Sequence, residues 1–265
     1  MSDFNAKEYW EKRLKNDYSL HGVGYIGLGE EYNKWMYKVR TRIFKRAIKK
    51  ISLNNSSTNV LDIGSGTGFY IDLWNKQKIK NVEGADITQV AVENLKEKFP
   101  ENNFYCLDIS SSNDVKTLNQ GTYDVISIFD VLFHIVDDEK FLNALKNINA
   151  LLNKNGKLIL TDNFIHDKTF RSQHHVSRNI DEFYNALNEA GFKVEYRKPA
   201  FVFMNAPVDA RGKFLKWIWV TQEKLIYRNK RFSSIVGSFF YPLELLFTKL
   251  KTEGPSTEIV ICSKK

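Results

Sequence analysis

The stretch that decides the fold is Val60-Leu-Asp-Ile-Gly-Ser-Gly-Thr-Gly68, an apolar run that leads into three closely spaced glycines. The apolar part predicts a buried strand, and Phe69 begins the helix that we expect after the turn. Glycine is needed where the backbone turns sharply or where a ligand lies against the main chain with no Cβ in the way. The stretch therefore predicts a strand, a ligand-binding turn and a helix.

The spacing of these glycines restricts the ligand. Gly64, Gly66 and Gly68 form G-x-G-x-G, which differs from the G-x-G-x-x-G of nicotinamide and flavin sites. It also differs from the G-x-x-x-x-G-K-[ST] of phosphate loops, because no lysine follows the glycines. Asp62 places a carboxylate beside the turn, where it repels phosphate and attracts a cation. These features predict a nucleoside-type ligand without a pyrophosphate.

Outward from this stretch, short β-branched runs alternate with helical patterns. Helices are expected over 88–99, 138–152 and 179–190, where apolar residues recur at helical spacing. Strands are expected at 59–63, 81–86, 103–107, 123–129, 156–161, 192–196 and 257–263. Such alternation requires right-handed crossovers and a sheet covered on both faces. The sequence predicts an α/β fold with a doubly wound, seven-stranded, mostly parallel sheet.

The predicted strands divide the chain into three segments that form one structural unit. Residues 51–197 and 256–265 form the predicted cofactor-binding α/β domain, and residues 1–50 precede it as a helical cap segment, a loop followed by an amphipathic helix. Residues 198–255 separate the last two strands and are too many for a bare loop. Because this interval is rich in helical and aromatic patterns, we interpret it as a helical insert that forms a substrate lid before the last strand.

Charge is distributed unevenly along the chain. The net charge is +8, made of +6 over residues 1–50, −6 over residues 51–192 and +8 over residues 193–265. Two basic ends that fold over an acidic middle would concentrate anionic ligands at the opening between them. The sequence has no run of 18 uncharged apolar residues, and no apolar stretch follows the charges at its start. We therefore expect a soluble, cytoplasmic protein in which Cys106 and Cys262 are buried thiols.

The stretch from Asn59 to about Phe192, together with the last strand, resembles the class I S-adenosylmethionine-dependent methyltransferases of the small-molecule type (type 11/12-like). The glycine turn looks like motif I of that family. The resemblance implies a Rossmann-like methyltransferase fold, methyltransferase activity and S-adenosylmethionine as cofactor. It also implies that the turn binds the cofactor through Asp62, Gly64, Ser65, Gly66 and Gly68.

Further positions match later markers of the same family. Asp86 ends the second predicted strand, where the family's acid holds the ribose hydroxyls, and Ile87 follows it. Asp108 matches the acid that takes the adenine amino group, with Ile109 beside the ring. The remaining candidates for the cofactor site are Phe129 and Asp130 at the end of strand four, with Tyr25 and Arg40 for the methionine carboxylate or the acceptor.

His134 is the candidate general base. It lies four residues past Asp130, at the carboxyl end of strand four, where doubly wound sheets bind ligands. Histidine has an unperturbed pKa of about 6.5, which suits proton removal near neutral pH. His166, His174 and His175 are second candidates. We expect no metal, although Asp130 with Asp162-Asn163 could resemble the magnesium site of catechol-type O-methyltransferases.

The acceptor is less well defined by the sequence. Phe129-Asp-Val-Leu lacks the Asn/Asp-Pro-Pro-Tyr that relatives methylating nucleic-acid bases carry after strand four, so we do not expect a nucleic-acid partner. The insert carries aromatic residues that could wall an apolar pocket: Trp217, Trp219, Phe239, Phe240, Tyr241 and Phe247. Basic residues interleave with them: Arg211, Lys213, Lys216, Lys224, Arg228, Lys230 and Arg231.

This mixture suits an anionic, partly apolar acceptor, such as a glycan intermediate, a carrier-linked metabolite or a lipid, and also contact with a membrane surface. The sequence thus predicts methyl transfer to oxygen or nitrogen of a small-molecule acceptor. The alternatives are an RNA or protein methyltransferase and a non-catalytic cofactor-binding module for interactions. The oligomeric state stays open.

Overall fold

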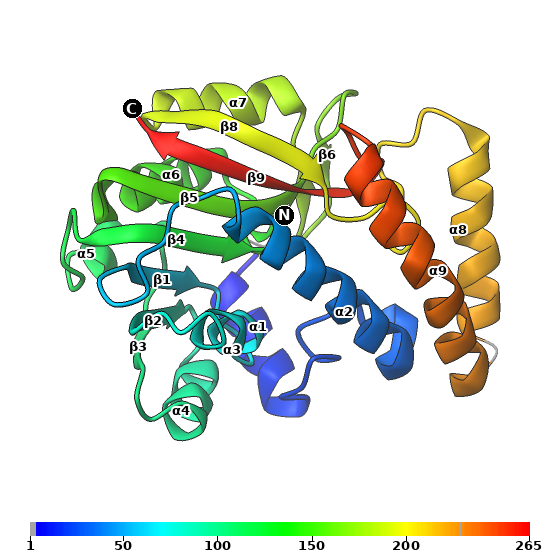
Figure 1. Ribbon diagram of the computed structural model, residues 1–265, viewed down its shortest axis with the longest axis horizontal. Coiled ribbons are helices and arrows are strands. Elements are labelled where there is room, and N and C mark those ends of the chain that lie inside the picture. The colour runs from blue at the N-terminus through cyan, green and yellow to red at the C-terminus, as the bar shows by residue number, and fades with distance from the viewer. Residues whose placement is uncertain (1–3, 228) are drawn as a thin grey trace.

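The computed structural model describes residues 4–227 and 229–265 and contains a seven-stranded sheet (Figure 1). Its order is β3-β2-β1-β4-β5-β9-β8. The strands span β1 Asn59–Ile63, β2 Asn81–Asp86, β3 Asn103–Cys106, β4 Tyr123–Phe129, β5 Leu152–Asn163, β8 Phe192–Pro199 and β9 Thr257–Lys264. The first five pair in parallel, and β9 runs antiparallel between β5 and β8. The predicted fold class is confirmed.

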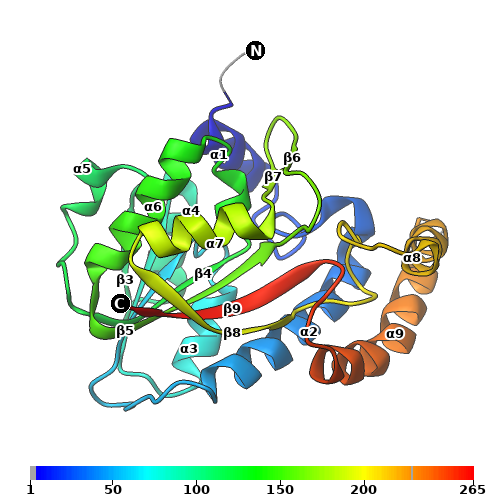
Figure 2. The same ribbon diagram turned by 90° about the horizontal axis from the view of Figure 1, so that it is seen from above.

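Helices cover both faces of this sheet (Figure 2). One face packs against α2 (Gly29–Ile48), α3 (Phe69–Asn75) and α4 (Gln89–Lys98), and the other against α5 (Ser112–Val115), α6 (Asp138–Leu151) and α7 (Ile180–Glu189). Successive strand side chains point to opposite faces, so Val60 joins the first core and Leu61 the second. A short hairpin, β6 (Phe170–Arg171) and β7 (Val176–Ser177), lies outside the sheet.

Three of these helices begin at a polar side chain that caps them. Thr88, Asp137 and Asn179 each accept a hydrogen bond from a backbone N–H in the first turn of α4, α6 and α7. Such caps satisfy donors that the helix itself leaves unpaired. The predicted helices are confirmed to within two residues at each end.

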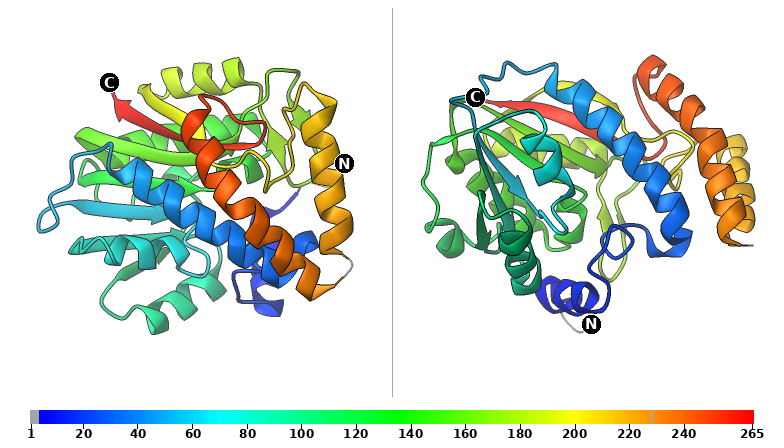
Figure 3. Two further views of the ribbon diagram at one scale, coloured as in Figure 1. Left: turned by 45° about the vertical axis from the view of Figure 1, so that its right-hand side comes forward. Right: turned by 60° about the horizontal axis from the view of Figure 1, so that its bottom comes forward.

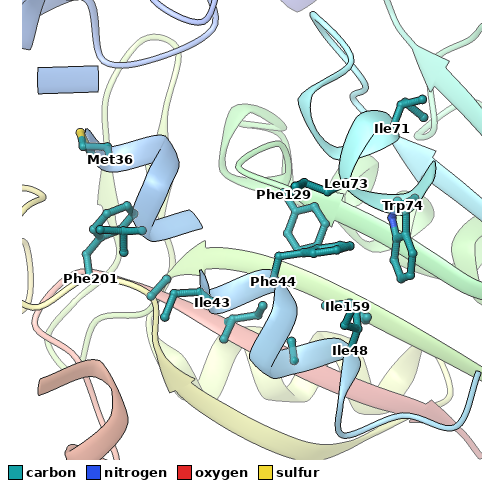
Figure 4. Close-up of a cluster of buried hydrophobic side chains, with 14 of the residues drawn as sticks. Met36, Ile43, Phe44, Ile48, Ile71, Leu73, Trp74, Phe129, Ile159 and Phe201 are labelled. Carbon is teal, nitrogen blue, oxygen red and sulfur yellow. The ribbon is translucent and has the colours of Figure 1, made fainter. Parts of the chain in front are cut away.

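The long helix α2 is fixed on the sheet by aromatic packing (Figure 4). Phe44 of α2 meets Trp74 of α3 edge-on, with ring centroids 4.8 Å apart, and lies 6.1 Å from Phe129 of β4. The indole Nε1–H of Trp74 donates to Ser127 Oγ at 3.0 Å, so the polar atom of this buried ring is satisfied. The predicted amphipathic helix of the N-terminal segment is thus confirmed, and its apolar side forms part of the core.

Two details differ from the sequence prediction. Residues 6–16, read as part of a loop, form α1 (Ala6–Asn16), capped by the Asn5 side chain. A single turn, η1 (Ile26–Leu28), then leads into α2. Cys262 is buried in β9 as expected, whereas Cys106 is exposed at the end of β3, where the edge strand has no further neighbour to cover it. Neither cysteine forms a disulfide.

The insert contains two helices, α8 (Lys213–Ile226) and α9 (Lys230–Leu250), which pack side by side, with α9 against α2 (Figure 3). A Cβ on Gly237 of α9 would lie 2.3 Å from Trp35 Cδ1 of α2, so the two helices approach closely only because glycine stands there. Among the described residues, no helix is long and apolar enough to cross a membrane.

A buried carboxylate joins α9 to the chain that follows β8. Glu244 accepts hydrogen bonds from three successive backbone N–H groups, those of Val202, Phe203 and Met204. Nearby, the Gln222 amide of α8 donates to the Phe203 carbonyl at 2.9 Å and accepts from the Tyr32 hydroxyl of α2 at 2.8 Å. These buried hydrogen bonds fix how α8 and α9 sit on the chain, because a different packing of the helices would leave the polar groups buried and unpaired.

Candidate functional site

A cavity opens at the carboxyl ends of β1, β2 and β4, the edge where doubly wound sheets bind ligands. The chain reverses its direction of winding here, since β2 and β4 flank β1 on opposite sides. Most of the predicted cofactor residues line this cavity together with His134: Gly64, Ser65, Gly66, Asp86, Ile87, Asp108, Ile109, Phe129, Asp130 and Arg40. Asp62, Gly68 and Tyr25 do not line it.

The glycine turn has the geometry that its sequence requires. Gly64, Gly66 and Gly68 all have positive φ, of 74°, 50° and 79°. A Cβ on Gly64 would lie 2.2 Å from Val131 Cγ2, so a larger residue would displace the segment after β4. Gly68 has a different role, because it begins α3 where a Cβ would lie 2.4 Å from the Phe99 ring. The first two glycines therefore shape the cavity wall, and the third allows α3 to pack on α4.

Asp62 lies beneath the turn rather than in its wall. Its Oδ1 accepts a hydrogen bond from Ser127 Oγ at 2.6 Å, since the two residues are register partners on β1 and β4. Its Oδ2 is buried and has no hydrogen-bond partner. Burial raises the pKa of Asp62 to about 7. A buried oxygen without a partner calls for an explanation, and a cationic ligand group above it would supply one.

Two further carboxylates follow β2 and β3. Asp86 Oδ2 accepts from the Gly66 N–H at 2.9 Å, and its Oδ1 accepts from the Thr88 N–H and Oγ–H at 2.9 and 2.7 Å. Burial raises the pKa of Asp86 despite these hydrogen bonds. Asp108 Oδ1 is held in the same way by Ser110. Ile87 and Ile109, which follow these carboxylates in the sequence, also line the cavity, so this part of its wall combines polar and apolar side chains.

Arg40 of α2 reaches the end of β4 and pairs with Asp130. Its Nε and Nη2 lie 3.0 and 2.9 Å from Asp130 Oδ2. Burial alone would lower the pKa of Arg40, but the Asp130 charge raises it, so the guanidinium stays protonated. Asp130 has φ +59°, an uncommon value for a residue other than glycine. Thr161 holds it there, accepting from the Asp130 N–H and donating to its Oδ1, both at 2.9 Å.

His134 ends η2 (Leu132–His134), a single turn after β4. Its Nδ1 lies 2.8 Å from the carbonyl oxygen of His174. Because a carbonyl oxygen only accepts hydrogen bonds, we assign the ring proton to Nδ1. Nε2 is then the acceptor nitrogen of the neutral ring. The edge of the Trp10 indole meets the ring, with centroids 5.0 Å apart. Burial lowers the pKa of His134 to about 4, so the ring is neutral at physiological pH.

The second histidine candidates take other places. His174 stacks on Tyr9 at 5.5 Å, and His175 Nε2 lies 3.0 Å from Ser177 Oγ. Neither is among the residues that line the cavity. His166 does not line it either, and its Nδ1 lies 2.7 Å from the Asp209 carboxylate. Of the four histidines considered, His134 alone belongs to the described lining.

The remaining candidates are also engaged elsewhere. Tyr25 stacks on Trp219 of α8 with ring centroids 6.3 Å apart. The Asp162 carboxylate accepts from the Asn163 N–H, and Asn163 Oδ1 accepts from Thr257 Oγ1 at 2.8 Å. Within the described parts of the chain, no three His, Cys, Asp or Glu side chains are placed to hold a metal ion.

The sequence reading missed the helix that covers the cavity. Ala6, Trp10 and Leu14 of α1 line it, and their spacing of four residues is the signal that could have identified this face. Glu11, on the same helix, accepts from the N–H of Gln89 at 2.9 Å, at the start of α4. The first helix therefore spans from the glycine turn to His134 and shields the space between them.

The loop after α1 is braced by Arg13. Its Nε and Nη2 donate to the carbonyls of Gly22 and Gly24, both at 2.6 Å, and its guanidinium lies 4.6 Å from the centre of the Trp10 ring. The Tyr18 hydroxyl donates to the Gly66 carbonyl at 3.0 Å. These contacts hold α1 and its loop against the glycine turn.

The insert contributes none of the described lining residues. Of its predicted aromatic residues, Trp219 is buried, whereas Phe240, Tyr241 and Phe247 are half-buried. Trp217 and Phe239 are exposed. Arg228 lies outside the described residues, and Lys230 is described only by its backbone. The segment expected to be a lid therefore lies on the outer side of α2, and α1 occupies the position over the cavity.

Comparisons with known proteins agree with this geometry. The family described as "Methyltransferase domain" matches residues 32–197. The chain is 31% identical over 103 residues to a ribosomal protein L11 methyltransferase of Lactobacillus johnsonii, covering 39% of this chain and 30% of that protein. It is 32% identical over 111 residues to an mRNA cap guanine-N(7) methyltransferase of Schizosaccharomyces pombe, covering 38% and 31%. The chain thus spans about a third of these relatives.

A solved structure shares the fold over the whole chain. Magnesium protoporphyrin IX methyltransferase from Synechocystis, with bound S-adenosylmethionine, aligns with a TM-score of 0.58 and 14% identity, covering 100% of both chains. The family match includes the glycine turn, both following carboxylates and His134. The chain therefore belongs to the class I S-adenosylmethionine-dependent methyltransferase family, as its motifs predict, and S-adenosylmethionine is the cofactor of that family.

Proposed function

We propose that the protein transfers a methyl group from S-adenosylmethionine to an oxygen or nitrogen of a small metabolite that is partly apolar or anionic. The observation that carries the proposal is a single cavity that joins the glycine turn to His134 under the cover of α1. A cover built from Trp10, Leu14 and Val23 leaves little room for a folded protein or an RNA to approach the reacting atoms.

Residues in the cavity wall, together with Asp62 beneath the glycine turn, fit the cofactor. The buried Asp62 Oδ2, which has no partner in the protein, suits the amino group of the methionine part. Asp86 and Asp108 suit the ribose hydroxyls and the adenine amino group, with Ile87 and Ile109 against the ring. Gly64 and Gly66 allow the main chain to approach the ligand because no Cβ intervenes. Arg40 suits the methionine carboxylate or an acidic acceptor.

The chemistry needs little from the protein beyond alignment and proton removal. S-adenosylmethionine, when bound, supplies a methyl group on a positively charged sulfur. The methyl–sulfur bond breaks as the bond to the acceptor oxygen or nitrogen forms, and Nε2 of His134 takes the proton that the acceptor loses. The positive charge is lost from sulfur as it appears on the imidazole, so the net charge of the cavity does not change.

The cavity lining supports an acceptor of this kind. The lining residues next to His134 are apolar or aromatic and include Trp10 and Ile135. Arg40 is the one Lys or Arg side chain among the described lining residues, and Asp130 neutralises much of its charge. This combination favours an acceptor with an apolar body and at most one acidic group.

A second candidate is methylation of RNA or protein. It is favoured by the basic ends of the chain and by the similarity to a cap methyltransferase and to ribosomal protein L11 methyltransferases. Retention of RNA that falls steeply with salt would support it, because phosphate contacts release counterions. Cofactor binding without turnover on any acceptor would instead favour a non-catalytic module.

The proposal is tested first at the cofactor. Asp86→Asn should weaken S-adenosylhomocysteine binding about a hundredfold in calorimetry, since hydrogen bonds to a charged carboxylate are lost. Asn retains one acceptor oxygen for the Gly66 N–H, and thermal unfolding verifies that the variant folds. Asp72→Asn, which changes an acid paired with Lys76 on α3, is the control and should leave the affinity unchanged. An unaltered affinity in Asp86→Asn would overturn the cofactor assignment.

The acceptor is then sought directly. Fractionated small metabolites, total RNA and total protein are incubated separately with cofactor labelled in its methyl group. Label in the small-molecule fraction supports the proposal, and label in RNA or protein with none in that fraction contradicts it.

A further inference from the structure

We propose that the exposed surface of α8 and α9 docks the protein onto an anionic lipid bilayer. Thirteen large hydrophobic side chains are described as exposed, and nine of them lie between residues 214 and 250. Scattered single apolar residues on a surface need no explanation, whereas a concentration of them marks an interaction site. We define the insert surface as the exposed side chains of these two helices.

The apolar residues of the insert surface follow the helical period. On α8, Phe214, Trp217 and Val220 recur every three residues, and Phe214 and Trp217 are 67% and 64% exposed. On α9, Ile235, Phe239 and Leu246 lie on one side, with Phe239 63% exposed. Such spacing forms a stripe along each helix. The two helices pack side by side at one end of the molecule (Figure 1), so both stripes are carried by that end.

This stripe is distinct from the sides of the helices that pack on the rest of the chain. The buried side of α8 contains Trp219, Gln222 and Ile226. The buried positions of α9 include Gly237 and Glu244, which meet α2 and the 202–204 segment. Both helices therefore use one side for the fold and leave a second apolar side outside it.

The charge around the stripe identifies the partner. Exposed cations flank the apolar residues: Lys213, Lys216, Lys224, Arg231 and Lys249. Residues 198–255 contain ten basic and four acidic residues. Three of those acids are engaged away from the stripe, since Glu244 is buried against backbone N–H groups, Asp209 pairs with His166 and Glu253 pairs with Arg197. The net field of the insert surface is thus positive.

A bilayer with anionic headgroups fits this surface better than two other partners. Aliphatic side chains such as Ile235 and Leu246 gain nothing from phosphates or bases but gain from burial at the acyl boundary. A second copy of the chain would bring the same cations against each other, which disfavours a symmetric dimer. No described helix spans a membrane, so the contact is interfacial. Each basic residue near an anionic leaflet adds to the attraction.

Sedimentation with vesicles tests the proposal on the full chain. Vesicles of phosphatidylcholine with phosphatidylglycerol should bind the protein, and raising the salt or removing phosphatidylglycerol should release most of it. Trp217→Ser with Phe239→Ser should lower the binding at least about tenfold, because both rings are removed from the acyl boundary. Phe170→Ser, at a side chain that is 63% exposed on β6, is the matched control and should bind as the parent does.

Charge is tested separately. Lys213→Glu with Lys216→Glu should lower binding to anionic vesicles about tenfold or more, whereas Lys96→Glu with Lys154→Glu changes the net charge equally and should lower it much less. Unchanged S-adenosylhomocysteine affinity verifies that all variants fold. Equal effects of the two charge pairs would overturn the proposal. It would also be overturned by salt-sensitive RNA retention without vesicle binding, or by a dimer in solution that Phe239→Ser dissolves.

Discussion

The two segments that flank the family match differ in their relation to the cavity. Residues before position 32 form α1 and its loop, and they cover the space between the glycine turn and His134. Residues after position 197 form the insert and then β9; the insert helices pack beside α2, and the insert contributes no described residue to the lining. On the proposed function, we therefore expect acceptor selection to depend on the start of the chain, whereas the insert carries a separate surface.

The comparison also separates two halves of one cavity, which we propose bind the cofactor and the acceptor. The cofactor half is built from strand ends and backbone, with each carboxylate held by neighbouring N–H or hydroxyl groups. The acceptor half is built from side chains of separate segments, with Trp10 from α1 meeting His134 from the turn after β4. A change in the second half should therefore alter turnover while leaving cofactor binding intact.

The largest effect is expected at His134. His134→Ala should lower kcat about a hundredfold on the acceptor, with S-adenosylhomocysteine affinity unchanged, because only the proton acceptor is lost. The pH profile is a second measure. With a pKa of about 4, His134 is unprotonated above that pH, so the rate should stay level down to about pH 5 and fall below it. A parent rate that already falls near pH 6.5, or a variant that retains the parent kcat, would exclude this role.

A smaller effect is expected from loosening the cover. Arg13→Ala removes the hydrogen bonds to Gly22 and Gly24 and the contact with Trp10, so α1 should dissociate more readily from the glycine turn. We expect cofactor affinity to fall about tenfold, measured by calorimetry, since charge-assisted hydrogen bonds are lost. Lys12→Ala changes an exposed cation of the same helix and serves as the control. Equal affinities of the two variants would show that α1 does not hold the cofactor.

The smallest effect is expected in the insert. Trp217→Ser, at a ring that is 64% exposed and not among the lining residues, should change cofactor affinity and kcat by less than about twofold. Both quantities are measured with a soluble acceptor in the absence of lipid. A larger loss would mean that the insert reaches the cavity after all and that the two flanking segments act together.

The sheet and the common location of the candidate cofactor residues could be predicted from the sequence because their signals are local. Short apolar runs that alternate with helical patterns define the strands. Because Asp86, Asp108 and Asp130 stand at or just after strand ends, the parallel sheet places them at one edge without help from distant contacts. Gly68 was assigned to the ligand because it stands in the motif, yet the structure gives it to the packing of α3 on α4. That distinction depends on Phe99, which is thirty-one positions away.

The cover and the placement of the insert could not be predicted in the same way. α1 has the apolar spacing of a helix, but its short length and many charged residues made a loop equally plausible. The position of the insert depends on Gly237 meeting Trp35 and on Glu244 meeting the 202–204 backbone. Contacts between residues so far apart in the chain leave no periodic signal.

The position of β9 has a consequence for how the chain acquires its shape during synthesis. This strand lies between β5 and β8, yet it emerges from the ribosome after the entire insert. Until it arrives, β5 and β8 each lack their neighbour, and their open backbone groups can pair with other chains. We expect nascent chains that stop before residue 257 to aggregate. In the full chain, β9 completes the sheet last, by pairing with β5 on one side and β8 on the other.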